Sequence, residues 1–358
     1  GEKTMAFRMK TTIETLGDDP SIKKITLTNE RGMSVSLCTW GASIYQICVP
    51  DRTGKSEKVL LEYQNPSEFL KTNQYFGKTI GRTSGRIGGA KFELNGTTYR
   101  LQVNDNDNNL HAGDNGFHNQ NFKMSVFRFP LYTRVVFKYI SPNGEGGFPG
   151  RVKLMVTYTF FRMNNDLHVS YDAISNQDTL LNITNHSYFN LSGDFKDTIH
   201  DHRLKLDSER YVAMNEQLVG YSVLPVNRTL DFSVPKKIGK DLNNSVLVDH
   251  AWIGYDHTYV RGEKERLVNL KVFEDDNPFA VLYDEKSGRE LRVYTDYPAM
   301  NVYSDNYPSY KVLANGKEEK RYQAICLEPE FIPFTTKDYV LRAQSHFHQK
   351  IRYTFKTR

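Results

Sequence analysis

The chain has 358 residues, of which 39% are hydrophobic and 25% are charged. This balance is typical of a folded globular protein and excludes a disordered chain. The net charge is only +5, and Lys and Arg are scattered among Asp and Glu, so the concentrated basic patch of a nucleic-acid-binding protein is missing. No run approaches 18 apolar residues, and we therefore predict no membrane-spanning helix.

The three cysteines are Cys38, Cys48 and Cys326, and no CxxC or Cys/His metal spacing accompanies them. An odd number of cysteines is a poor basis for a disulfide framework. Reduced thiols in a reducing compartment fit this count best. Residues 1–10 contain no apolar run of the kind that a signal peptide needs. We therefore predict a cytoplasmic location.

The predicted strands show a hydrophobic period of two. Apolar residues alternate with polar ones over residues 33–38 and again over residues 152–160. Because successive side chains of a strand point to opposite faces, this pattern buries one face of each strand. Asn95-Gly96 predicts a tight hairpin, since both residues accept a positive φ. Residues 141–150 predict a longer hairpin loop.

Helical signals are sparse. A short helix is predicted at residues 66–70, where Pro66 stands at its start. No linker rich in Pro, Gly or Ser and no internal repeat divides the chain. The strand pattern runs from about Ile25 to Phe355, so we predict one large antiparallel all-β domain over residues 1–358, either a two-sheet sandwich or a barrel. Periodicity alone does not give the order of its strands.

Four segments place a titratable or charged group among polar neighbours. In the first, residues 81–89, the planar guanidinium of Arg86 suits paired oxygen atoms. This segment lacks the GxxxxGK[ST] spacing of a phosphate-binding loop. In the second, His111 follows a turn-rich polar run, and loops on rigid sheets commonly carry function. An ordinary surface histidine is the alternative interpretation of His111.

The third segment is residues 184–193, in which His186 stands between amides, hydroxyls and aromatic rings. Histidine has the side-chain pKa closest to neutrality. Neighbours that can hold its tautomer make it a candidate general acid or base. The alternative is a histidine whose polar atoms are simply satisfied by the neighbouring residues.

In the fourth segment Glu328 ends the apolar run 324–327. Partial desolvation there would raise the pKa of its carboxyl and make it a better base. Pro329 is expected to stop the strand and so to separate Glu330 from Glu328. Asp256 lies beside aromatic residues in the segment 252–259, an arrangement suited to sugars. The alternative for Glu328 is an ordinary charge at a strand end, and the alternative for Asp256 is an aspartate in a turn.

Other catalytic motifs are missing from the sequence. It contains neither HExxH nor GxSxG. Nothing in the pattern calls for a metal ion or a nucleotide, and we predict that the protein needs no cofactor.

In their order along the chain these segments resemble the motifs of the aldose 1-epimerases, also called galactose mutarotases. The matching stretches are residues 85–87, 109–113, 184–191, 254–257 and 326–329. The resemblance implies a large antiparallel β-sandwich of the galactose-mutarotase type. It also implies an enzyme that interconverts the α and β anomers of free aldohexoses such as galactose and glucose, as a monomer or homodimer.

The resemblance further implies a role for each residue. Glu328 matches the general base that takes the proton of the C1 hydroxyl. His186 matches the general acid that protonates the ring oxygen, and His111 matches a second histidine that polarises the same region. The residues implied to hold the sugar are Arg86, Asp256 and Asn109.

Three other functions compete with this interpretation. A hexose-6-phosphate mutarotase of the same fold would need further cations, and Arg82 beside Arg86 is the available one. A sugar-binding protein without catalysis would need no acid/base pair. A glycoside hydrolase would use Glu328 and Asp256 as its carboxylates. Residues 329–335 differ from the family pattern, which leaves the preferred sugar open.

Overall fold

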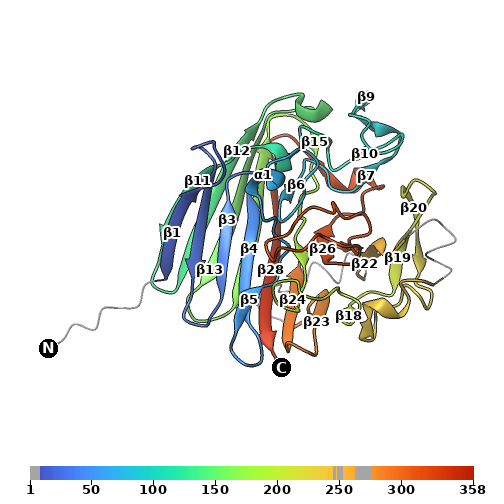
Figure 1. The fold of residues 1–358 in the computed structure, drawn as a ribbon. Helices are drawn as coiled ribbons and strands as arrows, with labels where there is room; N and C mark the ends of the chain where they lie inside the picture. The colour runs from blue at the N-terminus through green and yellow to red at the C-terminus, as the bar shows by residue number, and fades with distance from the viewer. Residues whose placement is uncertain (1–8, 245–246, 248–252, 263–275) are drawn as a thin grey trace.

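The computed structural model describes residues 9–244, 247, 253–262 and 276–358 (Figure 1). Trp252, one of the aromatic residues near Asp256, lies outside the described residues. The α-helix α1 spans Pro66–Phe69. The side chain of Asn65 accepts from the Ser67 N–H and caps it, so the predicted short helix is confirmed. No helix in these residues is long and apolar enough to cross a membrane.

The largest sheet has nine strands, and all neighbouring strands are antiparallel. In spatial order these are β11 (Lys123–Arg128), β12 (Tyr132–Ser141), β13 (Val152–Phe161), β14 (Asp166–Ser175), β28 (His346–Thr357), β24 (Arg289–Thr295), β23 (Ala280–Tyr283), β18 (Arg203–Leu206) and β21 (Lys236–Lys237). The alternation predicted at 152–160 appears as alternating buried and half-exposed side chains along β13.

Two further sheets complete the framework, with five and six strands. The five-stranded sheet has the order β1 (Lys10–Thr15), β2 (Lys23–Thr28), β3 (Ser34–Cys38), β4 (Ser43–Pro50) and β5 (Ser56–Lys58). The six-stranded sheet has the order β17 (Tyr188–Phe189), β26 (Ile325–Glu330), β25 (Ala299–Tyr303), β22 (Asp256–Val260), β19 (Arg210–Met214) and β20 (Gly220–Pro225).

Short elements connect these sheets. Four strand pairs are β6 (Thr79–Ile80) with β16 (Thr184–Asn185), β7 (Arg86–Ile87) with β10 (Asn109–Leu110), β8 (Lys91–Leu94) with β9 (Thr97–Arg100), and β15 (Thr179–Leu180) with β27 (Val340–Leu341). The 3-10 turns are η1 (Gly88–Ala90), η2 (Phe117–Asn119), η3 (Glu145–Gly147), η4 (Ile238–Lys240) and η5 (Thr336–Tyr339). Asn95 and Gly96 both have positive φ between β8 and β9, so the predicted hairpin is confirmed.

One hydrophobic cluster packs the three large sheets together. The Tyr158 hydroxyl on β13 donates to the Ala42 carbonyl beside β4, at 2.6 Å. The rings of Phe189 on β17 and Tyr353 on β28 are in contact, with centroids 5.7 Å apart. Each such buried side chain contributes about 1.5–3 kcal/mol. The nine-stranded sheet is thus one layer of a sandwich, and the predicted large antiparallel β-sandwich is confirmed (Figure 1).

Strand β26 differs from the sequence prediction. Pro329 was expected to end it, but the strand continues to Glu330. Pro329 has a described strand partner on one side only, Met300 of β25, because β17 pairs with Ile325 and Cys326 alone. Proline lacks an N–H and is tolerated where one side of the strand is open. The predicted break is therefore wrong, and Glu328 and Glu330 face the same side.

Candidate active site

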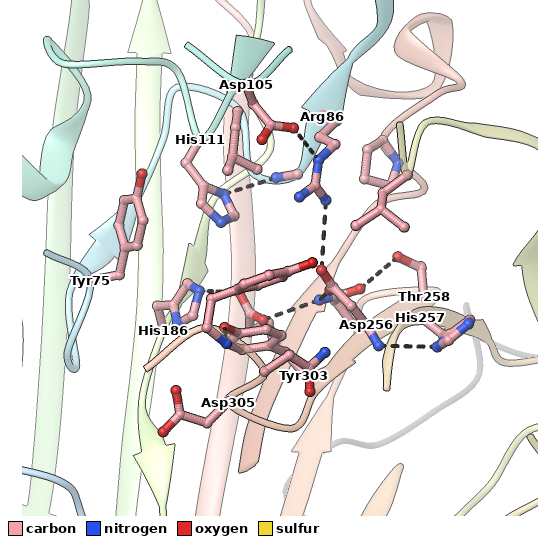
Figure 2. A pocket seen from close by; sticks show the side chains of 18 of the residues that line it. Tyr75, Arg86, Asp105, His111, His186, Asp256, His257, Thr258, Tyr303 and Asp305 are labelled. Atoms are coloured by element: carbon pink, nitrogen blue, oxygen red, sulfur yellow. Dashed lines mark hydrogen bonds and ion pairs between the residues drawn. The ribbon is translucent and has the colours of Figure 1, made fainter. Parts of the chain in front are cut away.

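A cavity of about 550 Å³ lies against the six-stranded sheet, with its walls completed by loops around β7 and β10. This volume is in the range of small-molecule sites. Five of the six predicted site residues line it, and Figure 2 labels four of them. These five are Arg86, His111, His186, Asp256 and Glu328.

Glu328 and His186 form a buried pair in this cavity. His186 Nε2 lies 3.3 Å from Glu328 Oε1, and the two side chains are 5% and 3% exposed. Burial raises the pKa of the Glu328 carboxyl well above its usual value, and Glu330 adds to the rise. Burial lowers the pKa of His186 to about 3. Burial thus disfavours the charged form of each group, and the contact sets a carboxyl and an imidazole, each able to carry a proton, side by side.

Aromatic rings hold His186 in place. Its imidazole stacks on Tyr75 and on Tyr188, with ring centroids 5.4 and 5.0 Å away. The Tyr303 ring meets it edge-on at 6.2 Å. These contacts fix the direction in which Nε2 points, and a proton-transfer group needs such a fixed geometry.

His111 is set up as a hydrogen-bond donor. Its Nδ1 accepts the Gly85 backbone N–H at 3.1 Å, so the neutral imidazole carries its proton on Nε2. Burial and the neighbouring His186 and Arg86 keep the pKa of His111 well below its usual value. The ring contacts His186 edge-on, with centroids 5.3 Å apart. A neutral N–H donor therefore stands beside the Glu328–His186 pair.

Arg86 joins two carboxylates at the other side of the cavity. Its Nε donates to Asp105 Oδ2 at 2.6 Å, and a terminal nitrogen lies 3.7 Å from Asp256 Oδ2. Burial alone would lower the pKa of Arg86, but Asp256 and Asp105 outweigh it and the net shift is upward. This group offers charged donors and acceptors to hydroxyl groups.

Asn301 connects the two parts of the site and was missed by sequence reasoning. Its Nδ2 donates to Asp256 Oδ1 at 3.0 Å and to Glu328 Oε2 at 3.2 Å. It lies on β25 opposite Glu328 and opposite Thr258 of β22. Only the strand order reveals this bridge, because nothing in the local sequence around Asn301 distinguishes it.

Glu330 also lines the cavity. The Ser84 hydroxyl donates to its Oε2 at 2.8 Å, and the Thr258 hydroxyl donates to its Oε1 at 3.1 Å. Burial raises the pKa of the Glu330 carboxyl to about 8. Its position follows directly from the continuation of β26 through Pro329.

Two residues singled out from the sequence lie elsewhere. Asn109 is fully buried behind the cavity wall, where its Nδ2 donates to the Gln102 carbonyl at 2.8 Å. The structure thus gives Asn109 no place in the lining, against the expectation of a sugar contact. The Arg82 guanidinium is buried and donates to carbonyls of the 141–150 loop, among them Gly150 at 2.7 Å.

Two clusters of described residues have the composition of a cation site. His111, His186 and Glu328 bring one ligand atom each within 4.8 Å of one another, and so do Asp172, His346 and His348 on the outer face of β14 and β28. Imidazole and carboxylate together suit zinc and similar divalent ions. In the cavity these are the same atoms that would transfer protons, so the two uses exclude each other.

Comparison with known proteins agrees with the motifs. The family model described as aldose 1-epimerase matches residues 23–354. Human galactose mutarotase is 33% identical over 317 residues, which cover 87% of this chain and 86% of the relative. Aldose 1-epimerase of Haemophilus influenzae is 32% identical over 321 residues, or 89% of each chain.

A solved structure shows the same architecture. Galactose 1-epimerase from Lactobacillus acidophilus superposes with a TM-score of 0.84 at 24% identity, over 98% of this chain and 99% of that one. The chain belongs to the aldose 1-epimerase family, and the resemblance inferred from its motifs is confirmed.

Proposed function

We propose that this protein is an aldose 1-epimerase that interconverts the α and β anomers of free aldohexoses, galactose and glucose among them. The observation that carries the proposal is the buried Glu328–His186 contact of 3.3 Å. Mutarotation needs one group that gives a proton and one that takes a proton at a single hemiacetal. A carboxyl and an imidazole in direct contact, in a cavity lined with polar groups, meet that need.

The reaction runs in two symmetric halves. Glu328 takes the proton of the C1 hydroxyl while His186 gives a proton to the ring oxygen, and the bond between C1 and that oxygen breaks. The C1 aldehyde rotates about its bond to C2, and the two transfers then reverse to close the ring on the other face. Each positioned group contributes about 10²–10⁴-fold to the rate.

The remaining residues hold the sugar during this exchange. His111 donates from Nε2 toward the ring oxygen and C1, where charge changes during opening. Arg86 and Asp256, linked at 3.7 Å, bind hydroxyls of the ring. Asn301, which donates to both Asp256 and Glu328, keeps the base aligned with the sugar-binding groups.

The cavity favours a free sugar over a sugar phosphate. A phosphate needs compensating cations, but Arg82 is committed to the 141–150 loop. The lining contains the further carboxyl groups of Asp305, Glu319 and Glu330, which supply no positive charge to a phosphate. A glycoside hydrolase working through Glu328 and Asp256 would leave the contact between His186 and Glu328 without a use.

Polarimetry of freshly dissolved sugars tests the proposal. The rate of approach to equilibrium is measured for α-D-galactose, α-D-glucose and glucose 6-phosphate, with and without enzyme. We expect kcat/KM for galactose to exceed that for the phosphate at least about tenfold, which requires only ~1.4 kcal/mol of discrimination. A preference for the phosphate, or release of sugar from a glycoside, would replace the proposal with the corresponding alternative.

We further propose a cytoplasmic location and a monomer or homodimer. The three cysteines are free, with Cys38 and Cys326 buried, which supports a reducing compartment. Size-exclusion chromatography with light scattering measures the oligomeric state directly, and a stable assembly larger than a dimer would contradict it.

A further inference from the structure

A second pair of buried carboxyl groups lines the cavity and takes no part in the proton transfer proposed above. Asp305 directly follows Ser304 at the end of β25, and Glu319 comes from the loop before β26. Each residue is 1% exposed, and both line the cavity. Glu319 Oε1 accepts from the Ser309 N–H at 2.9 Å and from the Ser309 hydroxyl at 2.6 Å.

Asp305 is held in a costly conformation. Its φ is +53°, in the left-handed region that favours glycine. Its Oδ2 is buried and has no hydrogen-bond partner among the described residues. Burial and the carboxyl of Glu319 raise the pKa of Asp305 well above its usual value. Strain and an unpaired buried polar atom together are more common at ligand sites than elsewhere.

Asp305 lies on the side of the cavity where the exocyclic carbon of a bound hexose is expected. Figure 2 shows Arg86 and Asp105 on one side of the Tyr303 ring and Asp305 on the other. Tyr303 also contacts His186, with ring centroids 6.2 Å apart. If Glu328 serves C1, His186 serves the ring oxygen and Arg86 serves the ring hydroxyls, the side of C5 is left for Asp305. The exocyclic carbon of a hexose, with its 6-hydroxyl, is attached there.

We propose that Asp305, supported by Glu319, binds the 6-hydroxyl of the hexose and so determines which aldoses the enzyme prefers. This inference rests on the proposed function. A carboxyl group accepts a hydrogen bond from a hydroxyl, and in its neutral form it also donates one. The bound hydroxyl gives Asp305 Oδ2 the partner that it lacks in the empty cavity. The same two carboxyl groups offer no cation to a 6-phosphate.

The variant Asp305→Gly tests this proposal sharply. Glycine adopts a φ of +53° freely, so the substitution removes the carboxyl without forcing the backbone. The two substrates are D-galactose and D-fucose, which is 6-deoxy-D-galactose and differs only at the group in question. We expect the KM for galactose to rise about tenfold, the scale of one lost hydrogen bond between a hydroxyl and a buried carboxyl group. The KM for D-fucose and both kcat values stay within about twofold of wild type.

Two further variants separate binding from structure. Asp305→Ala also removes the carboxyl, so we expect the same change in the ratio of the KM for galactose to the KM for D-fucose. Because alanine keeps a side chain at positive φ, we expect a lower Tm than for Asp305→Gly. Asp194→Gly is the matched control, since Asp194 is an exposed aspartate with a φ of +48° that does not line the cavity. It leaves both KM values unchanged.

The outcomes are distinct. An equal rise of both KM values in Asp305→Gly would show that Asp305 shapes the cavity without contacting the 6-hydroxyl, and would overturn the proposal. Unchanged KM values would overturn it as well. If the wild-type protein mutarotates neither sugar, the proposed function itself fails, and this inference fails with it.

Discussion

The buried carboxyl of Glu330 makes the folding stability of the protein depend on pH. Its pKa is raised to about 8 by burial, so the folded protein binds this proton more tightly than the unfolded chain does. Stability from this group is therefore complete below the unfolded pKa and is lost as the pH rises toward the folded pKa. The relevant window runs from the ordinary glutamate pKa to about 8.

We expect the stability of Glu330→Gln relative to wild type to be higher at pH 8 than at pH 5. The amide keeps the shape and stays neutral, so the variant loses this cost of ionisation. The difference in Tm between variant and wild type should grow by on the order of 2 °C or more across that range. Thermal denaturation at the two pH values measures it, with exposed Glu93→Gln as the control that shows no such trend. A constant difference would mean that Glu330 is ionised without penalty.

Much of the site was predicted from titratable residues that have polar neighbours in the sequence. His111, His186 and Glu328 meet in the cavity as expected, although their roles remain predictions until measured. Asn109 belongs to the same motif as His111, but its buried side chain bonds to the Gln102 carbonyl and does not line the cavity. A motif shows that a segment is near the site, while the direction of each side chain depends on the folded backbone.

Strand alternation predicted the elements, but pairing determined the site. The register of β22, β25 and β26 places Asn301 beside Glu328 and Thr258. These residues are far apart in sequence, so no local pattern indicates that they meet. The continuation of β26 past Pro329 depends in the same way on the short pairing of β17. Sheet order is a long-range property, and local propensity gives little information about it.

The Arg82 side chain makes several hydrogen bonds to the loop between β12 and β13. Arg82 Nη2 donates to the Ser141 hydroxyl at 2.9 Å and to the Pro142 and Gly150 carbonyls at 3.0 and 2.7 Å. Arg82→Ala removes the donor to these acceptors, of which those of Ser141 and Gly150 are buried. We expect a loss of about 3 kcal/mol in the free energy of unfolding, measured by chemical denaturation.

The substrate preference of the Arg82→Ala enzyme should stay the same wherever the variant remains folded. The ratio of kcat/KM between galactose and glucose 6-phosphate is the measurement. Lys153→Ala, an exposed change on the outer face of β13, serves as the stability control. A selective loss of activity on the phosphate would mean that Arg82 reaches the substrate.

At the scale of the whole molecule, the nine-stranded sheet and the other two large sheets enclose a common core, and the cavity stands on the six-stranded sheet. The sandwich was predicted from alternation together with the family motifs. The cavity combines residues from β7, β22, β25 and β26 with loops beside them, so its shape could not be read from any one segment.

The imidazole and carboxyl atoms of the cavity give a prediction about metal ions. Proton transfer completes the proposed reaction, so we expect full activity after dialysis against a strong chelator. Added Zn²⁺ should inhibit, because it would occupy the lone pairs of His111, His186 and Glu328. Excess chelator should then restore the rate in polarimetry.

The outer cluster provides the control for this experiment. His346→Ala removes one ligand of the Asp172, His346 and His348 group and should leave inhibition by Zn²⁺ unchanged. If dialysis abolishes activity and a divalent ion restores it, the cavity holds a catalytic metal and the role of the Glu328–His186 pair has to be revised.

The most direct test of the account is the rate of galactose mutarotation by Glu328→Gln. The amide keeps the size and shape of the side chain but cannot take the proton of the C1 hydroxyl. We expect kcat to fall about 10²–10⁴-fold, with circular dichroism and Tm close to those of wild type. The exposed Glu93→Gln should retain full activity. A folded Glu328→Gln enzyme that brings α-D-galactose to equilibrium at nearly the wild-type rate would contradict the account.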